Sequence, residues 1–188
     1  LFILATTFGW LPSKSYRGIQ LNETEKDLRD YMRTVVNQMS DKIGIRNYQY
    51  YDNLEKAKKY ISNEFERLGY VVKYQSYSIG AQRFDNIIAS RSTSFDSKPL
   101  IIGAHYDSCF NPGADDNGSG IAGVLGLAKL FSNTPVVKKL IFVAFVNEEP
   151  PFFHTQSMGS RVYSRELKAK KIDIEGAIIL EMIGSYSE

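Results

Sequence analysis

Two apolar segments, Leu100–Ala104 and Ile121–Phe131, are separated by a polar loop that is rich in glycine and acidic residues. The first segment has the length of a buried strand, and the second has the length of a buried helix. A loop between two buried elements is held in a fixed position, so its side chains are suited to form a site. The stretch 103–120 therefore predicts the end of a strand, a loop that carries a site, and the start of a helix.

The alternation of strand and helix continues after this loop. Apolar strands are predicted at Lys139–Val146 and Gly176–Leu180, with a helix at Ser157–Lys168 between them. Strands that alternate with helices of this length indicate parallel pairing through right-handed crossovers. The fold class is therefore α/β, with parallel strands at the centre of a sheet that is flanked by helices.

The first half of the chain predicts two helices and a hairpin. Asn22 is a plausible cap, with Glu25 three residues later, for a helix that reaches Met39. A second amphipathic helix covers about Asp52–Leu68 and stops at Gly69. Strands at Tyr70–Tyr77 and Phe84–Arg91, joined by a turn at Gly80, predict a hairpin at a sheet edge.

The chain has 188 residues, of which 43% are hydrophobic and 23% are charged. This composition is typical of one globular domain and excludes a disordered or fibrous chain. A formal net charge of +2, from scattered lysines and arginines, gives no basis for a nucleic-acid partner. Cys109 is the only cysteine, so an intrachain disulfide is excluded. We interpret it as a small filler beside a buried strand rather than as a metal ligand.

The apolar stretch Leu1–Leu11 is too short to span a bilayer, which takes about 20 residues. It is consistent with the end of a signal peptide or membrane anchor, and equally with a segment that packs on the domain. We divide the chain into an N-terminal segment, 1–21, and a domain, 22–188. This interpretation favours a secreted, periplasmic or membrane-anchored protein over a cytoplasmic one, and it leaves the oligomeric state open.

Each of the three predicted central strands ends on residue types that bind metals. The first is followed by His105 and Asp107, the second by Glu148 and Glu149, and the third by Glu181. A single acid at such a place is more often a helix cap or a solvated turn. Because the carboxyl ends of parallel strands lie side by side, all three groups together predict one crevice that binds a ligand.

Carboxylates gathered in this way would repel one another unless a cation lay between them. One imidazole with several carboxylates suits zinc, with manganese or cobalt as alternatives. Asp107 is well spaced to accept a hydrogen bond from the second ring nitrogen of His105 and so to orient it. Side chains of the adjacent Glu148 and Glu149 point in opposite directions, so one can bind metal while the other holds a proton.

Four ordered motifs resemble the zinc-dependent aminopeptidases of clan MH, the family that also includes the glutaminyl cyclases. They are GAHYDS at 103–108, GADDNGSG at 113–120, NEEPPFF at 147–153 with MGSRVY at 158–163, and LEMIG at 180–184. The resemblance implies a mixed, mostly parallel sheet between helices, of the zinc-exopeptidase, phosphorylase/hydrolase-like type. It also implies two zinc ions that share one bridging aspartate.

The resemblance implies a role for each matching residue. His105 and Glu181 would bind the first zinc, Glu149 would bind the second, and Asp116 would bridge the two, with a cis peptide bond after it. Asp107 would orient His105, and Glu148 would be the general acid and base.

The motifs depart from the family in two ways. Position 181 is usually aspartate, and the family's last ligand is a histidine farther downstream than Glu188. The other histidine, His154, is interpreted as a loop residue near the substrate cleft. We therefore expect 22–188 to be a zinc peptidase domain that lacks its C-terminal part, with apolar sheet surface left uncovered. Two zinc ions are expected per complete domain, and one tight site in this chain.

The leading functional hypothesis is an aminopeptidase. It would hydrolyse N-terminal residues from peptides with a free N-terminus, using metal-activated water and Glu148 as general base. One alternative is a glutaminyl-cyclase-like acyltransferase with a single zinc, although the Asn117–Gly120 turn and the Asn147–Glu149 stretch look more like the peptidases. Another is a non-catalytic, peptidase-like scaffold domain. Such relatives usually lose site residues, whereas His105, Asp116, Glu148 and Glu149 are all present here.

Overall fold

The computed structural model describes residues 20–91, 97–132, 134 and 136–184. Its strands are β1 (Val71–Ile79), β2 (Gln82–Ser90), β3 (Leu100–His105), β4 (Leu140–Phe145) and β5 (Gly176–Ile179). Its helices are α1 (Glu23–Asn37), α2 (Tyr51–Arg67), α3 (Gly120–Ser132) and α4 (Gly159–Ala169), and two π-helical turns are η1 (Gln38–Ile43) and η2 (Ala114–Ser119).

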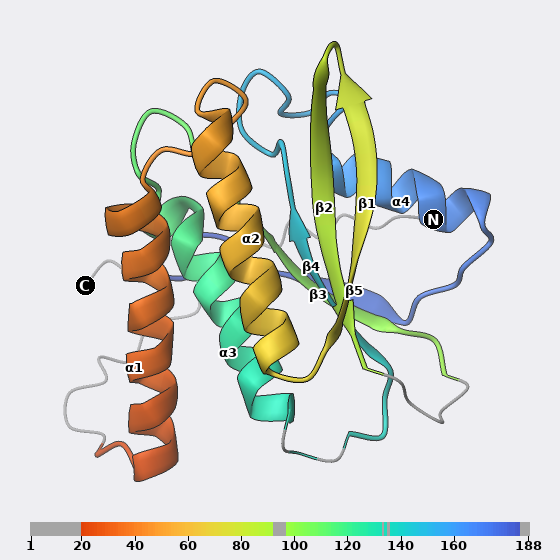
Figure 1. Ribbon diagram of the computed structural model, residues 1–188. Coiled ribbons are helices and arrows are strands. Elements are labelled where there is room, and N and C mark those ends of the chain that lie inside the picture. Colours follow the sequence, from red (N-terminus) through yellow and green to blue (C-terminus); the bar gives the residue numbers. More distant parts are fainter. Residues whose placement is uncertain (1–19, 92–96, 133, 135, 185–188) are drawn as a thin grey trace, which may run out of the picture.

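The strands form one mixed sheet in the order β1-β2-β4-β3-β5 (Figure 1). β3 pairs in parallel with both β4 and β5, whereas β2 is antiparallel to β1 and β4. Among the described strands, β2 alone therefore runs opposite to the others, which confirms the mixed, mostly parallel sheet. The edge hairpin is also confirmed, with its turn at Gly80, where φ is +58°.

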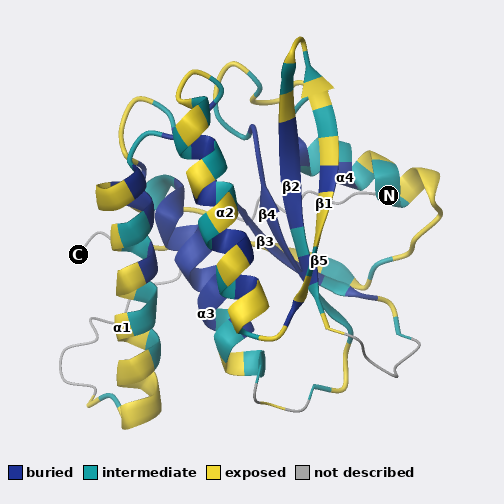
Figure 2. Ribbon diagram, in the orientation of Figure 1, coloured by how far each residue is buried: buried dark blue, intermediate teal, exposed yellow. Residues whose placement is uncertain are grey.

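Helices cover both faces of the sheet. α2 and α3 lie on one face, α1 packs against α3 on the outside, and α4 lies on the opposite face (Figure 1). Ile102 and Phe142 belong to the larger core, on the α2–α3 side, while Ile101 and Val143 belong to a smaller cluster with Tyr163 of α4. The central strands β3 and β4 are buried along most of their length (Figure 2) because their apolar residues alternate between these two cores.

The first helix begins as its sequence predicts. The Asn22 side chain accepts from the Glu25 amide at 2.9 Å, and the Asn22 amide donates to the Glu25 carboxylate at 2.8 Å. This capping box satisfies amides that have no partner within the helix. The helical path continues through η1 to Gly44, where φ is +79°, and is therefore longer than expected.

The last strand is the least covered. Among the described strands, β5 pairs only with β3, and its residues Ile178 and Ile179 are 47% and 52% exposed. This is the uncovered apolar sheet surface that we expected.

The stretch Leu1–Leu11 lies outside the described residues, and none of the described helices is long and apolar enough to cross a bilayer.

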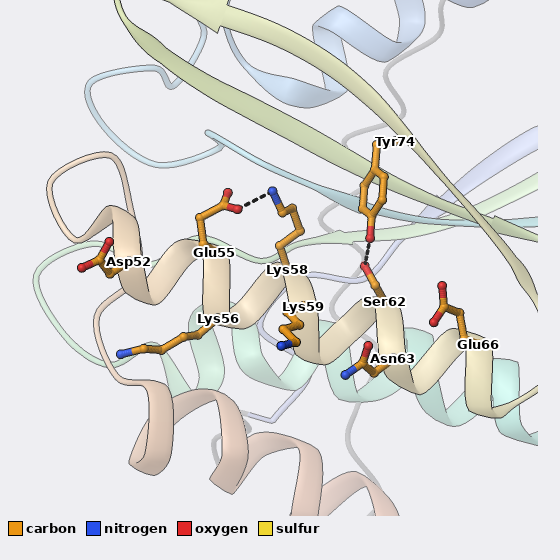
Figure 3. Close-up of a pocket in the computed structure, with 9 residues that line it drawn as sticks. All are labelled: Asp52, Glu55, Lys56, Lys58, Lys59, Ser62, Asn63, Glu66 and Tyr74. Carbon is orange, nitrogen blue, oxygen red and sulfur yellow. Dashed lines mark hydrogen bonds and ion pairs between the residues drawn. The ribbon is translucent and has the colours of Figure 1, made fainter.

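A groove of about 600 Å³ runs along the outer side of α2 beside β1 (Figure 3). Two of its charged groups are paired: the Lys58 ammonium lies 2.5 Å from Glu55, and it also lies 2.8 Å from Asp85. The Tyr74 hydroxyl donates to Ser62 at 2.9 Å. None of the residues that line this groove belongs to the loops after β3, β4 or β5.

Gly103, in β3, leaves no room for a side chain. A Cβ atom there would lie 2.8 Å from the carbonyl oxygen of Val143 and 2.6 Å from the ring of Phe145. We expect Gly103→Ala to lower the free energy of unfolding by about 1–3 kcal/mol, because the core would be overpacked. Gly176→Ala is the control: its Cβ would meet only Leu100, at 3.7 Å, and should change stability by less than about 0.5 kcal/mol. Equal losses in urea titrations would contradict this account.

Candidate metal centre

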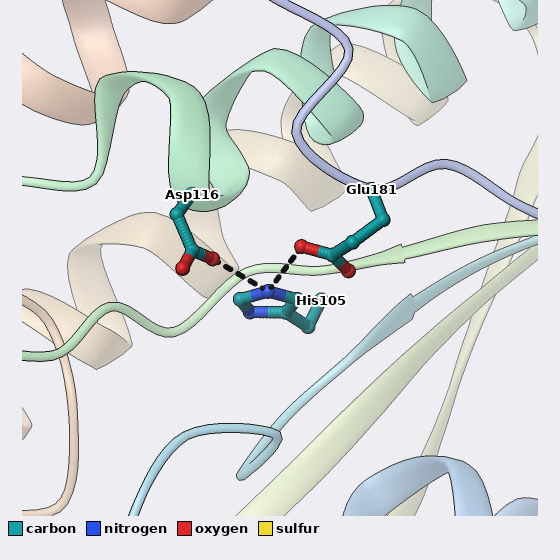
Figure 4. A group of neighbouring side chains, drawn as sticks. All are labelled: His105, Asp116 and Glu181. Carbon is teal, nitrogen blue, oxygen red and sulfur yellow. Dashed lines mark hydrogen bonds and ion pairs between the residues drawn. The ribbon is translucent and has the colours of Figure 1, made fainter. Parts of the chain in front are cut away.

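Three acids surround one buried histidine where the parallel strands end. The Nε2 atom of His105, the last residue of β3, lies 3.0 Å from a carboxylate oxygen of Asp116 and 3.3 Å from one of Glu181 (Figure 4). A carboxylate oxygen of Glu148 lies 3.8 Å from the same nitrogen. His105 itself is only 2% exposed. The strands thus bring together side chains from three separate parts of the sequence.

The spacing of these atoms suits a bound cation. One ligand atom from each of His105, Asp116 and Glu181 lies within 4.8 Å of the other two. Two ligands that are each about 2.0 Å from a tetrahedral zinc ion lie roughly 3.3 Å apart. The separations of 3.0 and 3.3 Å are therefore close to those of ligands that share one ion.

Asp116 is presented by an irregular turn. Within η2 its backbone is not helical, with φ −97° and ψ 95°, and the peptide bond from Asp116 to Asn117 is cis, as the resemblance implies. The Asp115 carboxylate points elsewhere: it accepts from the Gly184 amide at 2.9 Å and from the Ser119 hydroxyl at 3.0 Å. Of the two adjacent aspartates, only Asp116 faces His105.

Asn117 connects this turn to the chain that follows β5. Its buried amide donates to the carbonyl of Leu180 at 2.9 Å and to the carboxylate of Glu181 at 3.1 Å. Its oxygen accepts from the backbone amides of Gly120, at 2.9 Å, and Met182, at 3.3 Å. Asn117 thus fixes Glu181 relative to the turn that carries Asp116. Sequence analysis did not assign it this role, and the only signal was an amide side chain between acids and glycines.

Asp107 holds two parts of the site together. Its backbone carbonyl is 3.2 Å from Nδ1 of His105, and its carboxylate is slightly farther away, at 3.5 Å. The same carboxylate accepts from the backbone amides of Glu148, at 3.2 Å, and Glu149, at 3.0 Å. Sequence analysis expected the contact with the histidine ring but not the link to the loop after β4.

The two glutamates after β4 have different surroundings. Asn147, with φ +60°, turns the chain as the strand ends, and its side chain donates to the Tyr77 hydroxyl at 3.1 Å. The Glu148 carboxylate then reaches towards His105. No carboxylate oxygen of Glu149 lies within 4.0 Å of either ring nitrogen of His105. Of the two adjacent acids, only Glu148 has a carboxylate oxygen that close to the histidine ring.

Burial and crowding change the protonation of the site. Burial, together with the charge of Asp107 and against the opposing effect of His105, raises the pKa of Glu148 to about 7. Burial likewise raises the pKa of Glu149 to about 7, helped most by Asp116. Burial disfavours the charged form of His105, but hydrogen bonds with Asp107, Asp116 and Glu181 outweigh it and raise its pKa well above 6.5. The hydrogen bond from His105 lowers the pKa of Asp116.

Two further residues with metal-binding side chains lie outside this cluster. His154 is exposed, has φ +58°, and stacks on Phe153 with ring centroids 3.9 Å apart. Cys109 is half-buried, and burial raises the pKa of its thiol. Neither belongs to the group of metal-binding side chains found among the described residues.

The sequence matches Peptidase family M28 over residues 86–188, which is more than half of the chain. It is 36% identical over 173 residues to the uncharacterised protein YfbL of Escherichia coli, covering 87% of this chain and 50% of that protein. It is 33% identical over 110 residues to the aminopeptidase YwaD of Bacillus subtilis, covering 57% of this chain and 23% of that protein. The chain thus spans half or less of the length of these relatives.

Solved structures share the fold. BSAP, a zinc aminopeptidase from Bacillus subtilis, is similar with a TM-score of 0.72 at 17% identity, over 82% of this chain and 69% of that one. Tannerella forsythia glutaminyl cyclase is similar with a TM-score of 0.68 at 22% identity, over 86% of this chain and 62% of that one. At these identities the similarity concerns the fold alone, and one fold can support different reactions.

The raised pKa values predict how the metal-free protein responds to pH. Between pH 4.5 and about pH 7, Glu148 and Glu149 bind more protons in the folded chain than in the unfolded chain. The free energy of unfolding should therefore fall as the pH rises from about 5 to about 8. His105 acts in the same direction. Its protonated form stabilises the folded chain below pH 6.5, and this contribution is lost as the pH rises through the raised folded-state pKa of His105.

Urea titrations with a chelator present, repeated across this pH range, measure the effect. Glu148→Gln removes one of the titrating groups and should flatten the dependence on pH. Glu175→Gln, at an exposed glutamate outside the site, should retain the wild-type slope. A Glu148→Gln variant with an unchanged slope would contradict the assignment.

Proposed function

Because this chain belongs to peptidase family M28, we propose that it is the core of a zinc-dependent aminopeptidase. It removes N-terminal residues from peptides that have a free N-terminus. The observation that carries this proposal is the convergence of Asp116 and Glu181 on Nε2 of buried His105, with Glu148 at 3.8 Å from the same atom. The other observations fit this one.

The residues present suit zinc. Zinc is bound in proteins by histidine nitrogen and by aspartate or glutamate oxygen, and one imidazole with several carboxylates supplies both kinds of atom. His105, Asp116 and Glu181 would hold one ion, and Glu149 together with the shared Asp116 would hold part of a second. When bound, zinc supplies Lewis acidity that lowers the pKa of a coordinated water.

Glu148 is suited to move the proton during hydrolysis. Its carboxylate is near the ligands but farther from His105 than either of them, and it is 26% exposed. Burial raises the pKa of Glu148 to about 7, so the group can take a proton from water and return it at neutral pH. Asp107 holds the backbone of Glu148 and Glu149, so it positions both side chains. The proton taken by Glu148 is then delivered to the amine that leaves.

A second candidate is a glutaminyl-cyclase-like acyltransferase with a single zinc, and the fold shared with the Tannerella forsythia enzyme supports it. Two assays separate the candidates. A peptidase releases an amino acid from an aminoacyl anilide, whereas a cyclase closes a ring on an N-terminal glutamine. We also propose that the protein acts outside the cytoplasm, and that the N-terminal segment 1–21 contains the end of a signal peptide or membrane anchor.

The role of Glu148 can be tested by replacing it with its isosteric amide. Glu148→Gln should lower the rate of anilide hydrolysis by about 10²–10⁴-fold, because general base catalysis contributes that much. Bound zinc, measured by mass spectrometry after dialysis, should be nearly unchanged. Glu175→Gln is the matched control and should keep both activity and zinc. Loss of zinc from Glu148→Gln would show that this residue is a ligand.

The role of Asp116 can be tested against its neighbour. Asp116→Ala removes the carboxylate that faces His105, so zinc content and activity should both fall, and the remaining acids should destabilise the fold. Asp115→Ala removes only contacts to Gly184 and Ser119 and should retain zinc. The opposite pattern of zinc content would make Asp115 the ligand.

A further inference from the structure

Arg46 is completely buried behind the loop that carries the candidate metal centre. It is 0% exposed and lies between η1 and α2, in a segment to which sequence analysis gave no role. Its guanidinium group donates to five backbone carbonyls: Tyr106 at 2.6 Å, Pro112 at 2.5 Å, Gly113 at 3.1 Å, and Met39 and Gly44 at 3.2 Å each. All three of its nitrogen atoms are used in these contacts.

Three of these carbonyls belong to the loop between the metal-binding residues. Tyr106 directly follows His105, while Pro112 and Gly113 come just before the turn that presents Asp116. One rigid, planar group is therefore bonded to both ends of the 106–113 loop. The distance between those ends sets the separation of His105 from Asp116.

The backbone next to Arg46 strengthens the same connection. The Ser108 amide donates to the carbonyl of Arg46 at 2.9 Å, and the amide of Arg46 donates to the Ser108 hydroxyl at 3.3 Å. The Asn47 side chain donates to the carbonyl of Ser108 at 2.8 Å. The middle of the loop is thus bonded to the same short segment as its ends.

The charge of Arg46 has no direct acidic partner. Among the described residues, none of its nitrogen atoms lies within 4.0 Å of a carboxylate oxygen. Burial lowers the pKa of Arg46 to about 10, and nearby Asp107, Asp116 and Glu149 oppose that change. The guanidinium therefore stays charged at neutral pH. Burying a cation is costly unless it is paired or hydrogen-bonded, and the five backbone carbonyls supply that compensation for Arg46.

We propose that Arg46 is a positioning residue for the metal centre: by bonding both ends of the 106–113 loop, it holds His105 and Asp116 at the separation that one zinc ion requires. This rests on the proposed zinc site. Lysine cannot replace it, because a single ammonium has three donors at one point, whereas the guanidinium has five in a planar fork. Groups that orient metal ligands in this indirect way typically change metal affinity by about 10–100-fold.

The test measures zinc affinity in the full-length protein by competition with a chelating dye. Arg46→Lys keeps the charge and Arg46→Met removes it, and both should bind zinc about 10–100-fold more weakly than the wild type. Arg29→Lys, at an exposed arginine of α1, is the matched control and should bind normally. Cobalt substitution adds a second readout, since a changed ligand geometry should alter the visible absorption spectrum.

A purely structural role is separated from positioning by Ile61→Val, which loosens the buried core of α2 without touching the loop. Two results would overturn the inference. One is that folded Arg46→Lys binds zinc as tightly as the wild type. The other is that Arg46→Lys and Ile61→Val lose the same amount of melting temperature and Arg46→Lys binds zinc no more weakly than Ile61→Val. If the wild type and Arg29→Lys also fail to bind zinc, the proposed function fails, and this inference with it. Should Arg46→Met not fold, Arg46→Lys alone decides the question.

Discussion

Mutual repulsion among acids is the constraint on which this structure depends. Asp107, Asp116, Glu148 and Glu181 all have carboxylate oxygens within 4.0 Å of one ring nitrogen or the other of His105. Asp107 is buried and Glu148 is only 26% exposed, so water screens these two charges poorly. Two features of the chain reduce this repulsion. His105 pairs with Asp116, and the pKa values of Glu148 and Glu149 are raised. A bound divalent cation would balance the rest.

The residues that form the candidate metal centre could be predicted from the sequence, whereas those that hold them in place could not. Apolar strands that each end in acids or histidine identified His105, Glu148 and Glu181 as neighbours, because parallel strands place their carboxyl ends together. Arg46 and Asn117 act through backbone carbonyls and amides, and such contacts leave no pattern of residue types in a sequence. The longer first helix was missed for a related reason, since η1 is stabilised by tertiary packing of buried Met39 and Ile43.

The fold and the reaction are specified at different levels. The sheet and helices are shared with both a zinc aminopeptidase and a glutaminyl cyclase, so the architecture alone does not choose between hydrolysis and cyclisation. The choice depends on a few side chains in the loops after β3, β4 and β5. Those loops are tied to one another by Asp107 and Asn117, which means that a substitution in one loop is transmitted to the next.

The position of Glu181 has a consequence for how the protein matures. It is 76 residues from His105 in sequence, and it follows a strand that is half exposed and paired on one side only among the described strands. Contacts between such distant residues form late in folding, after the more local helices and hairpin. Because synthesis runs from the N-terminus to the C-terminus, His105 and Asp116 leave the ribosome before Glu181 does. Weakly covered strands also open readily in the native state, so the contact between Glu181 and His105 depends on one of the least protected parts of the fold.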